Sequence, residues 1–167
     1  MTDFTVAVLV RNEFGVLNRV TSMFRRRRFN ISSLTVSETE VPELSRITVS
    51  SSGLETDKKQ LINQLYKLPD VCSIKELDIV ESVSCELLLI KVKNDPESRA
   101  DVRDAAQAFG AKTLDYTRDS VIMRLTGTSR EIDAFIDLMR DFTILEICRT
   151  GIVSLERGSD TIRRTDL

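Results

Sequence analysis

The order of strand-like and helix-like segments constrains the fold most strongly, because one order occurs twice along the 167 residues. Short β-rich apolar runs alternate with segments whose apolar residues recur at helical spacing. In the first half, strands are predicted over 4–10, 31–37, 46–50 and 71–77, with helices near Val16 and Leu61. In the second half, strands are predicted over 85–93, 112–117, 121–126 and 144–149, with helices over 102–109 and 132–139, the latter capped by Thr128 or Ser129.

Each half therefore has the order β-α-β-β-α-β, which is a split β-α-β unit of the ferredoxin-like kind. The sequence predicts an α+β protein with two tandem ferredoxin-like domains, each near the lower end of domain size. We place the first over 1–79 and the second over 84–157. The last residues, 158–167, are polar without periodic apolar positions, and we expect a flexible tail.

Composition excludes several classes of protein. The net charge of −2 gives no field that would favour nucleic acid or an anionic membrane. The longest apolar runs, such as Leu87–Ile90, are too short to span a bilayer. The first residues lack a basic segment followed by an apolar one, so we expect no signal peptide and a cytoplasmic location.

The three cysteines, Cys72, Cys85 and Cys148, do not have the spacing of a disulfide framework or a zinc site. Each lies in an apolar strand-like run, which favours a buried, reduced thiol. We therefore predict no metal site in this chain.

Catalytic residues are not indicated either. The chain has no histidine, so the commonest general base is missing. No nucleophile stands beside a base at a known spacing, and no glycine-rich phosphate loop occurs, which disfavours a small enzyme. An RNA-binding module of the same fold would carry aromatic residues on its central strands, and 6–10 and 46–50 carry none.

The turn between the first strand and the first helix is the most informative segment. A helix N-terminus presents unpaired N–H groups and favours an anion such as the carboxylate of a free amino acid. Gly15 allows close approach of a ligand, and the Asn12 carboxamide can both donate and accept hydrogen bonds. The alternative is structural: Asn12 only caps the helix and Gly15 only relieves the turn.

Several motifs in order along the chain resemble the small regulatory subunits of acetohydroxyacid synthase, also called acetolactate synthase. The amino-terminal motifs are Asn12-x-x-Gly15-Val16-Leu17-x-Arg19-Val20, then 29–36, 44–48 and 64–71. The carboxy-terminal motifs are 86–92, 125–128 and 149–151. The first group resembles the family's ACT domain, and the second resembles its carboxy-terminal domain.

This resemblance implies a non-catalytic regulatory subunit that activates a separate catalytic (large) subunit in branched-chain amino-acid biosynthesis. It implies feedback inhibition by valine or a related branched-chain amino acid, bound where two ACT domains pair as a homodimer. Carried over by position, the effector-binding residues are Asn12, Gly15, Val16, Leu17, Asn30 and Ile31. Thiamine diphosphate and magnesium would belong to the catalytic partner, and this chain would hold no cofactor. An ACT-type regulator of another pathway is the alternative.

Two features at the end of the first helix need separate treatment. The family usually has a glycine before the aromatic-Asn pair, where this chain has Arg28; a glycine there would suit a positive φ. The run 25–28 is entirely arginine, which is typical of a solvated last helical turn. A nucleic-acid contact is disfavoured by the lack of neighbouring aromatic residues, and a docking patch for the catalytic subunit stays open.

Overall fold

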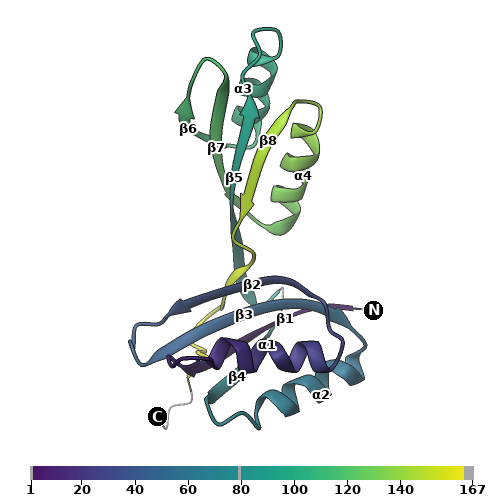
Figure 1. Cartoon of the computed structure of the whole chain (residues 1–167), viewed down its shortest axis with the longest axis vertical. Coiled ribbons are helices and arrows are strands. Elements are labelled where there is room, and N and C mark those ends of the chain that lie inside the picture. Colours follow the sequence, from purple (N-terminus) through teal and green to yellow (C-terminus); the bar gives the residue numbers. More distant parts are fainter. Residues whose placement is uncertain (1, 79, 164–167) are drawn as a thin grey trace. The chain divides into compact units, whose positions relative to one another are not determined.

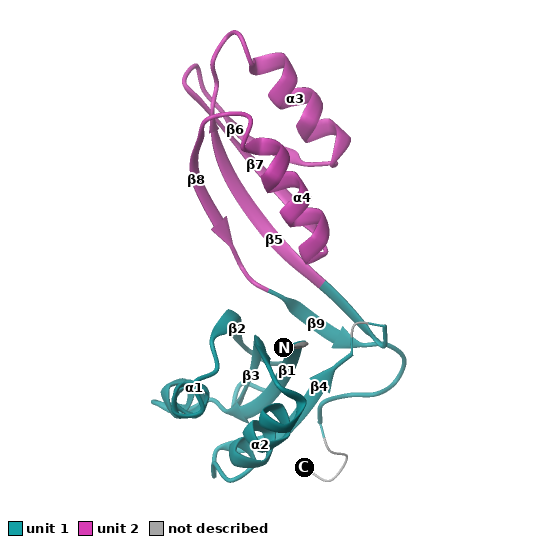
Figure 2. Ribbon diagram, turned by 90° about the vertical axis from the view of Figure 1, so that its right-hand side faces the viewer, with its two compact units in different colours: residues 1–84, 152–167 teal, residues 85–151 magenta. Residues whose placement is uncertain are grey.

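The computed structural model describes residues 2–78 and 80–163. The chain divides into two compact units, residues 1–84 together with 152–167, and residues 85–151 (Figure 2). The boundary falls inside a long strand, after Ser84. No helix among the described residues is long and apolar enough to cross a membrane.

Unit 1 has the predicted β-α-β-β-α-β order. Its elements are β1 (Thr2–Arg11), α1 (Val16–Arg26), β2 (Ile31–Glu38), β3 (Leu44–Gly53), α2 (Glu55–Leu65) and β4 (Val71–Leu77). All strand pairs are antiparallel, and the sheet has the order β2-β3-β1-β4, with β2 at one edge. Both helices cover the same face of the sheet (Figure 1).

The core of unit 1 follows from strand alternation. Val6, Val8 and Val10 point from β1 towards the helices and are at most 2% exposed. They pack against apolar residues of α1 and α2, among them Phe24 and Leu61, which are fully buried. Burying one such side chain stabilises the fold by about 1.5–3 kcal/mol, so this face holds the helices on the sheet.

Unit 2 repeats the same architecture, which confirms the predicted fold class. Its elements are β5 (Ser82–Lys93, shared across the boundary), α3 (Arg99–Ala108), β6 (Lys112–Tyr116), β7 (Ser120–Gly127), α4 (Ser129–Met139) and β8 (Ile144–Arg149). The sheet order is β6-β7-β5-β8. Leu88, Ile90 and Val92 of β5 form the core with residues of both helices, including Phe135.

Helix α4 begins with a complete capping box. The Thr128 side chain accepts from the Glu131 N–H, and the Glu131 carboxylate accepts from the Thr128 N–H at 2.7 Å. The backbone hydrogen bond from Thr128 lowers the pKa of Glu131. Of the two expected caps, Thr128 is thus the residue used.

One short strand lies beyond the elements that the sequence indicates. A short strand, β9 (Val153–Glu156), was not predicted; it pairs with β5 and clusters with unit 1. Residues 152–157 cluster with unit 1, and the domain bounds of 84–157 stay a prediction. A strand of four residues is too short for its periodicity to be recognised, and its partner is distant in sequence.

Residues 152–163 lie on the face of the unit 1 sheet opposite the helices. Arg46 of β3 donates from Nη2 to the Ser154 carbonyl at 2.8 Å, and Lys75 of β4 pairs with Glu156 at 2.5 Å. Burial lowers the pKa of Arg46, and nearby Glu156 acts in the opposite direction. In the sheet register Arg46 is opposite Leu9, which is 1% exposed although it points away from the helices. The segment thus covers this face.

The expected flexible tail, 158–167, is described only as far as Arg163. Within that part, Arg163 pairs with Glu40 at 3.0 Å, and Asp160 lies 3.9 Å from Lys75. Residues 158–163 thus make contacts with unit 1, and the flexibility of the tail stays a prediction. Residues 164–167 lie outside the described residues.

The prediction that the cysteines are buried is wrong for two of them. Cys85 and Cys148 are exposed, and Cys72 is half-buried. Cys148 is opposite Leu89 in the register, and Leu89 alternates with the core residues Leu88 and Ile90. Cys148 therefore points away from the helices, to the face of the sheet that they leave uncovered.

Candidate functional site

The turn between β1 and α1 is an uncapped helix start. Gly15 occupies the N-cap position in the left-handed conformation, with φ +79°, and makes no side-chain cap. The first turn of α1 contains no acidic residue. The first intrahelical bond runs from the Arg19 N–H to the Gly15 carbonyl at 3.0 Å. The N–H groups of Leu17 and Asn18 precede it, and they lack partners in the helical ladder.

Asn12 joins this turn to the far end of β2. Its Nδ2 donates to Glu38 Oε1 and to the Pro42 carbonyl, both at 3.0 Å. Its backbone N–H donates to the Glu43 carbonyl at 2.7 Å. Asn12 is therefore not the side-chain cap of α1, and its carboxamide is held by the connection between β2 and β3.

Arg19 lies over the same turn. It donates from Nε to Asp70 Oδ2 at 2.7 Å, and Asp70 in turn accepts the Arg11 N–H through its backbone carbonyl. A Cβ added at Gly15 would lie 3.3 Å from Arg19 Nη1, closer than most real contacts, and the positive φ would also be strained. Both the close contact and the positive φ therefore favour glycine at position 15.

The predicted effector residues next to Gly15 have different exposures. Val16 is 3% exposed and belongs to the core, so its side chain is unavailable to a ligand. Leu17 is 40% exposed and offers an apolar surface beside the free N–H groups. The structure thus brings Asn12, Gly15 and Leu17 together, with Val16 contributing only backbone.

Asn30 and Ile31 lie at the opposite end of β2 from the turn. Asn12 contacts Glu38, the last residue of β2, whereas Ile31 is the first. Seven residue steps of about 3.3 Å separate these ends by roughly 20 Å. Asn30 is exposed, with its carbonyl accepting from Ser51 Oγ at 2.7 Å, and Ile31 is partly buried against the core. Within one chain, the six residues therefore do not form one site.

Arg28 adopts the conformation that glycine would favour. Its φ is +59°, and among the described residues it is the one non-glycine residue with a positive φ. The Phe29 N–H donates to the Phe24 carbonyl and the Arg28 N–H to the Arg25 carbonyl, both at 3.0 Å, which is the Schellman pattern. The rings of Phe24 and Phe29 meet edge to face, with centroids 6.5 Å apart. The turn that carries Asn30 is thus kept despite the substitution.

The arginine run itself is solvent-facing. All four residues of 25–28 are exposed, and Arg27 Nη1 donates to Gln60 Oε1 at 3.3 Å. Arg25 and Arg26 occupy the last turn of α1, where positive charge complements the helix dipole.

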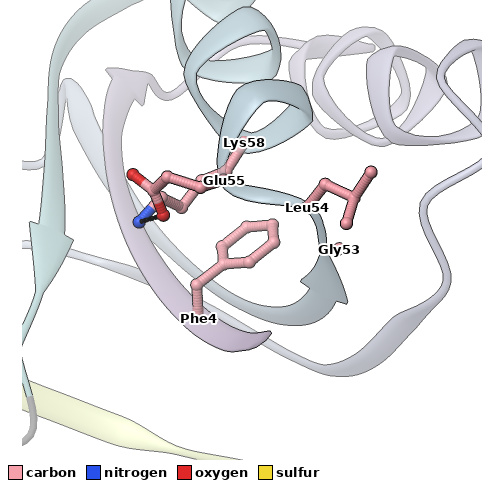
Figure 3. Close-up of a pocket in the computed structure, with 5 residues that line it drawn as sticks. All are labelled: Phe4, Gly53, Leu54, Glu55 and Lys58. Carbon is pink, nitrogen blue, oxygen red and sulfur yellow. Dashed lines mark ion pairs between the residues drawn. The ribbon is translucent and has the colours of Figure 1, made fainter. Parts of the chain in front are cut away.

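Two hollows in the surface lie elsewhere. One, in unit 1, is lined by Phe4, Gly53, Leu54, Glu55 and Lys58, and its volume of about 10 Å³ has room for one water molecule at most (Figure 3). Glu55 and Lys58 pair across it at 2.7 Å, and this hydrogen bond raises the pKa of Lys58. The other, in unit 2, is an open depression of about 670 Å³ between the start of α3 and the end of α4. Neither is lined by a predicted effector residue.

Glu38 is the residue at this turn that sequence reasoning missed. It lies 26 positions from Asn12, and nothing in the local pattern of β2 marks it. Only the sheet register brings the two together. Among the described residues, no group of three or more His, Cys, Asp or Glu side chains is arranged to hold a metal ion.

The fold defines the class of protein, a chain of two tandem ferredoxin-like domains. Residues 6–73 match the family model described as an AHAS small subunit-like ACT domain. Residues 85–158 match the model described as the small subunit of acetolactate synthase. The chain belongs to the acetolactate synthase small-subunit family, as its motifs predicted.

Individual relatives agree over nearly the whole length. A probable acetolactate synthase small subunit of Archaeoglobus fulgidus is 45% identical, covering 93% of this chain and 97% of the relative. The acetolactate synthase small subunit of Bacillus subtilis is 40% identical, covering 92% and 90%. The crystal structure of the small subunit from Thermotoga maritima superposes with a TM-score of 0.88 at 36% identity, covering 96% of this chain and all of that one.

Proposed function

We propose that this chain is a non-catalytic subunit that activates the catalytic subunit of acetolactate synthase and confers inhibition by valine or a related branched-chain amino acid. The observation that carries the proposal is the helix start at Gly15, which no side chain of its own caps. Two unpaired N–H groups and the positive end of the helix dipole suit the carboxylate of an amino acid. The exposed part of Leu17 suits its apolar side chain.

The distance between the two halves of the predicted site supports a homodimer. β2 lies at the edge of its sheet, and edge strands can pair with another chain. If two β2 strands pair antiparallel about a twofold axis, the start of one lies beside the end of the other. Asn30 and Ile31 of one chain then approach Asn12 and Gly15 of its partner. Such a dimer would assemble both halves of the effector site, and one chain alone does not.

Regulation then requires that the effector binds one state of the assembly more tightly than another. A coupling of about 1–3 kcal/mol is typical of such systems. Thiamine diphosphate and magnesium would act in the catalytic subunit, where pyruvate condenses, and this chain would supply only the effector site and the contact that stimulates activity.

The test combines binding with activity. Calorimetric titration of the isolated chain with valine, leucine and isoleucine should show saturable binding of at least one. Added to the catalytic subunit, the chain should raise acetolactate formation, and the same amino acid should reduce it again. Binding of none of the three, or an unchanged rate on mixing, would refute the proposal.

A further inference from the structure

The two units contain equivalent asparagines, and their surroundings can be compared directly. Asn12 and Asn94 each follow the first strand of their unit immediately, after Arg11 and Lys93. The backbone N–H of each donates into the next hairpin connection, to the carbonyls of Glu43 and Asp119 respectively, at 2.7 and 3.0 Å.

The carboxamide nitrogens also behave alike. Asn12 Nδ2 donates to the Pro42 carbonyl at 3.0 Å, and Asn94 Nδ2 donates to the Thr117 carbonyl at 2.6 Å. In both units the amide nitrogen is therefore turned towards the hairpin connection. The two units differ in the hydrogen bonds that the amide oxygen accepts.

In unit 2 the oxygen is occupied by a cation of the chain itself. Arg99 donates from Nε to Asn94 Oδ1 at 3.1 Å and from Nη2 to the Asn94 carbonyl at 3.2 Å. In unit 1 no hydrogen bond to Asn12 Oδ1 occurs within residues 2–78 and 80–163. Instead, Nδ2 makes a second bond, to Glu38 Oε1 at 3.0 Å.

This second bond determines which atom of Asn12 can meet a ligand. With Nδ2 donating to two acceptors, both of its hydrogens are used, and only Oδ1 is left. A carboxamide oxygen only accepts hydrogen bonds, so it suits the N–H of an ammonium group and not a carboxylate. The Glu38 carboxylate adds negative charge beside it, which further favours a cation.

We propose that Glu38 is a positioning residue for effector recognition, which rests on the function proposed above. It holds the Asn12 carboxamide with Oδ1 towards the ligand. The turn then accepts the α-ammonium at Asn12 and the α-carboxylate at the start of α1. Glu38 thereby selects for a zwitterionic amino acid over its deaminated analogue.

The experiment is calorimetry on the full chain with two ligands, valine and 3-methylbutanoate, which is valine without the ammonium. Glu38→Ala should weaken valine binding about 3- to 10-fold, the range of one lost hydrogen bond. It should not weaken 3-methylbutanoate binding, because this anion loses no ammonium contact and the Glu38 charge that repels it is gone. Glu38→Gln keeps an oxygen that accepts from Asn12 Nδ2, and most of the valine affinity should return. If 3-methylbutanoate does not bind the wild type, the test is the comparison of valine affinity between Glu38→Gln and Glu38→Ala.

A matched control is Glu43→Ala, which removes an exposed carboxylate in the same connection and leaves both Asn12 side-chain bonds in place. Valine affinity should stay within about 2-fold. Equal weakening of both ligands by Glu38→Ala, or a Glu38→Gln variant as weak as Glu38→Ala, would overturn the positioning role. A wild type that binds none of valine, leucine and isoleucine would instead refute the proposed function.

Discussion

The two units share one fold but differ at the turn after their first strand. Core residues of β1 and β5 correspond 82 positions apart, so that Val6, Val8 and Val10 match Leu88, Ile90 and Val92. Asn12 and Asn94 keep the same spacing. Both α1 and α3 begin without a side-chain cap, yet Asn12 is exposed, whereas Asn94 is 4% exposed and hydrogen-bonded to Arg99. The shared fold alone therefore does not account for the proposed effector site, which depends on the side chains of this one turn.

A second difference lies at the other end of the same strands. Phe4 in β1 corresponds to Glu86 in β5, and both are buried. Phe4 packs on the Phe29 ring, with centroids 5.7 Å apart. The Glu86 carboxylate instead accepts hydrogen bonds from the side chains of Ser129 and Arg149. The hydrogen bond between Glu86 and Arg149 raises the pKa of Arg149. Unit 1 closes its core with apolar packing, and unit 2 uses a hydrogen-bonded ion pair.

The largest effect should come from filling the open turn in unit 1. Gly15→Asp places a carboxylate at the free N–H groups of α1, and valine affinity should fall at least about 100-fold. Strain at the positive φ should cost about 1 kcal/mol, which leaves the domain folded. The complex with the catalytic subunit should stay active as valine rises, in a titrated activity assay.

The matched control for this substitution lies in unit 2. Gly110 also has a positive φ, +68°, and a Cβ there would meet open space. Gly110→Asp therefore introduces similar strain and the same charge away from the turn, and inhibition by valine should be unchanged. Loss of inhibition in both variants, or in neither, would contradict the assignment of the site to Gly15.

The ion pair of unit 2 should give the next largest effect. Glu86→Ala leaves a partly buried Arg149 with only Asp133, 2.7 Å from its Nη1, as an ionic partner. We expect a loss of about 3 kcal/mol in the free energy of unfolding by urea. The control is Glu146→Ala, an exposed carboxylate 3.7 Å from Lys91, which should cost less than about 1 kcal/mol. Similar losses for the two variants would show that burial of Glu86 is unimportant.

Removing the Arg99 side chain from the turn after β5 should have a smaller effect on the free energy of unfolding. Arg99→Ala removes two hydrogen bonds to Asn94 and leaves a buried carboxamide oxygen without its partner. The free energy of unfolding should fall by about 1–2 kcal/mol. Valine inhibition should be unaffected, because the proposed effector site lies in the other unit. A changed valine response with normal stability would mean that the two turns are not functionally separate.

The smallest effect concerns the end of α1. Arg28→Gly removes the left-handed strain, about 1–2 kcal/mol, and adds about 0.5–1 kcal/mol of backbone entropy loss on folding. The net expectation is a stabilisation of about 0.5–1 kcal/mol, measured as a rise in the urea midpoint. Phe29 should keep its place over Gly53, where an added Cβ would lie 2.4 Å from the ring. A destabilised Arg28→Gly variant would show that the arginine side chain makes a favourable contact.

Local periodicity and single-residue conformational preferences were enough to predict the two β-α-β-β-α-β units, the core strands and the strand-to-helix turn at Gly15. The sequence also carried the motifs that identify the family. Which distant residues meet depends on the folded chain. The pairing of Asn12 with Glu38, the separation of Asn30 from Gly15, and the placement of residues 152–163 on unit 1 all depend on sheet register. Register follows from how whole strands bury their faces, and no short stretch of sequence contains it.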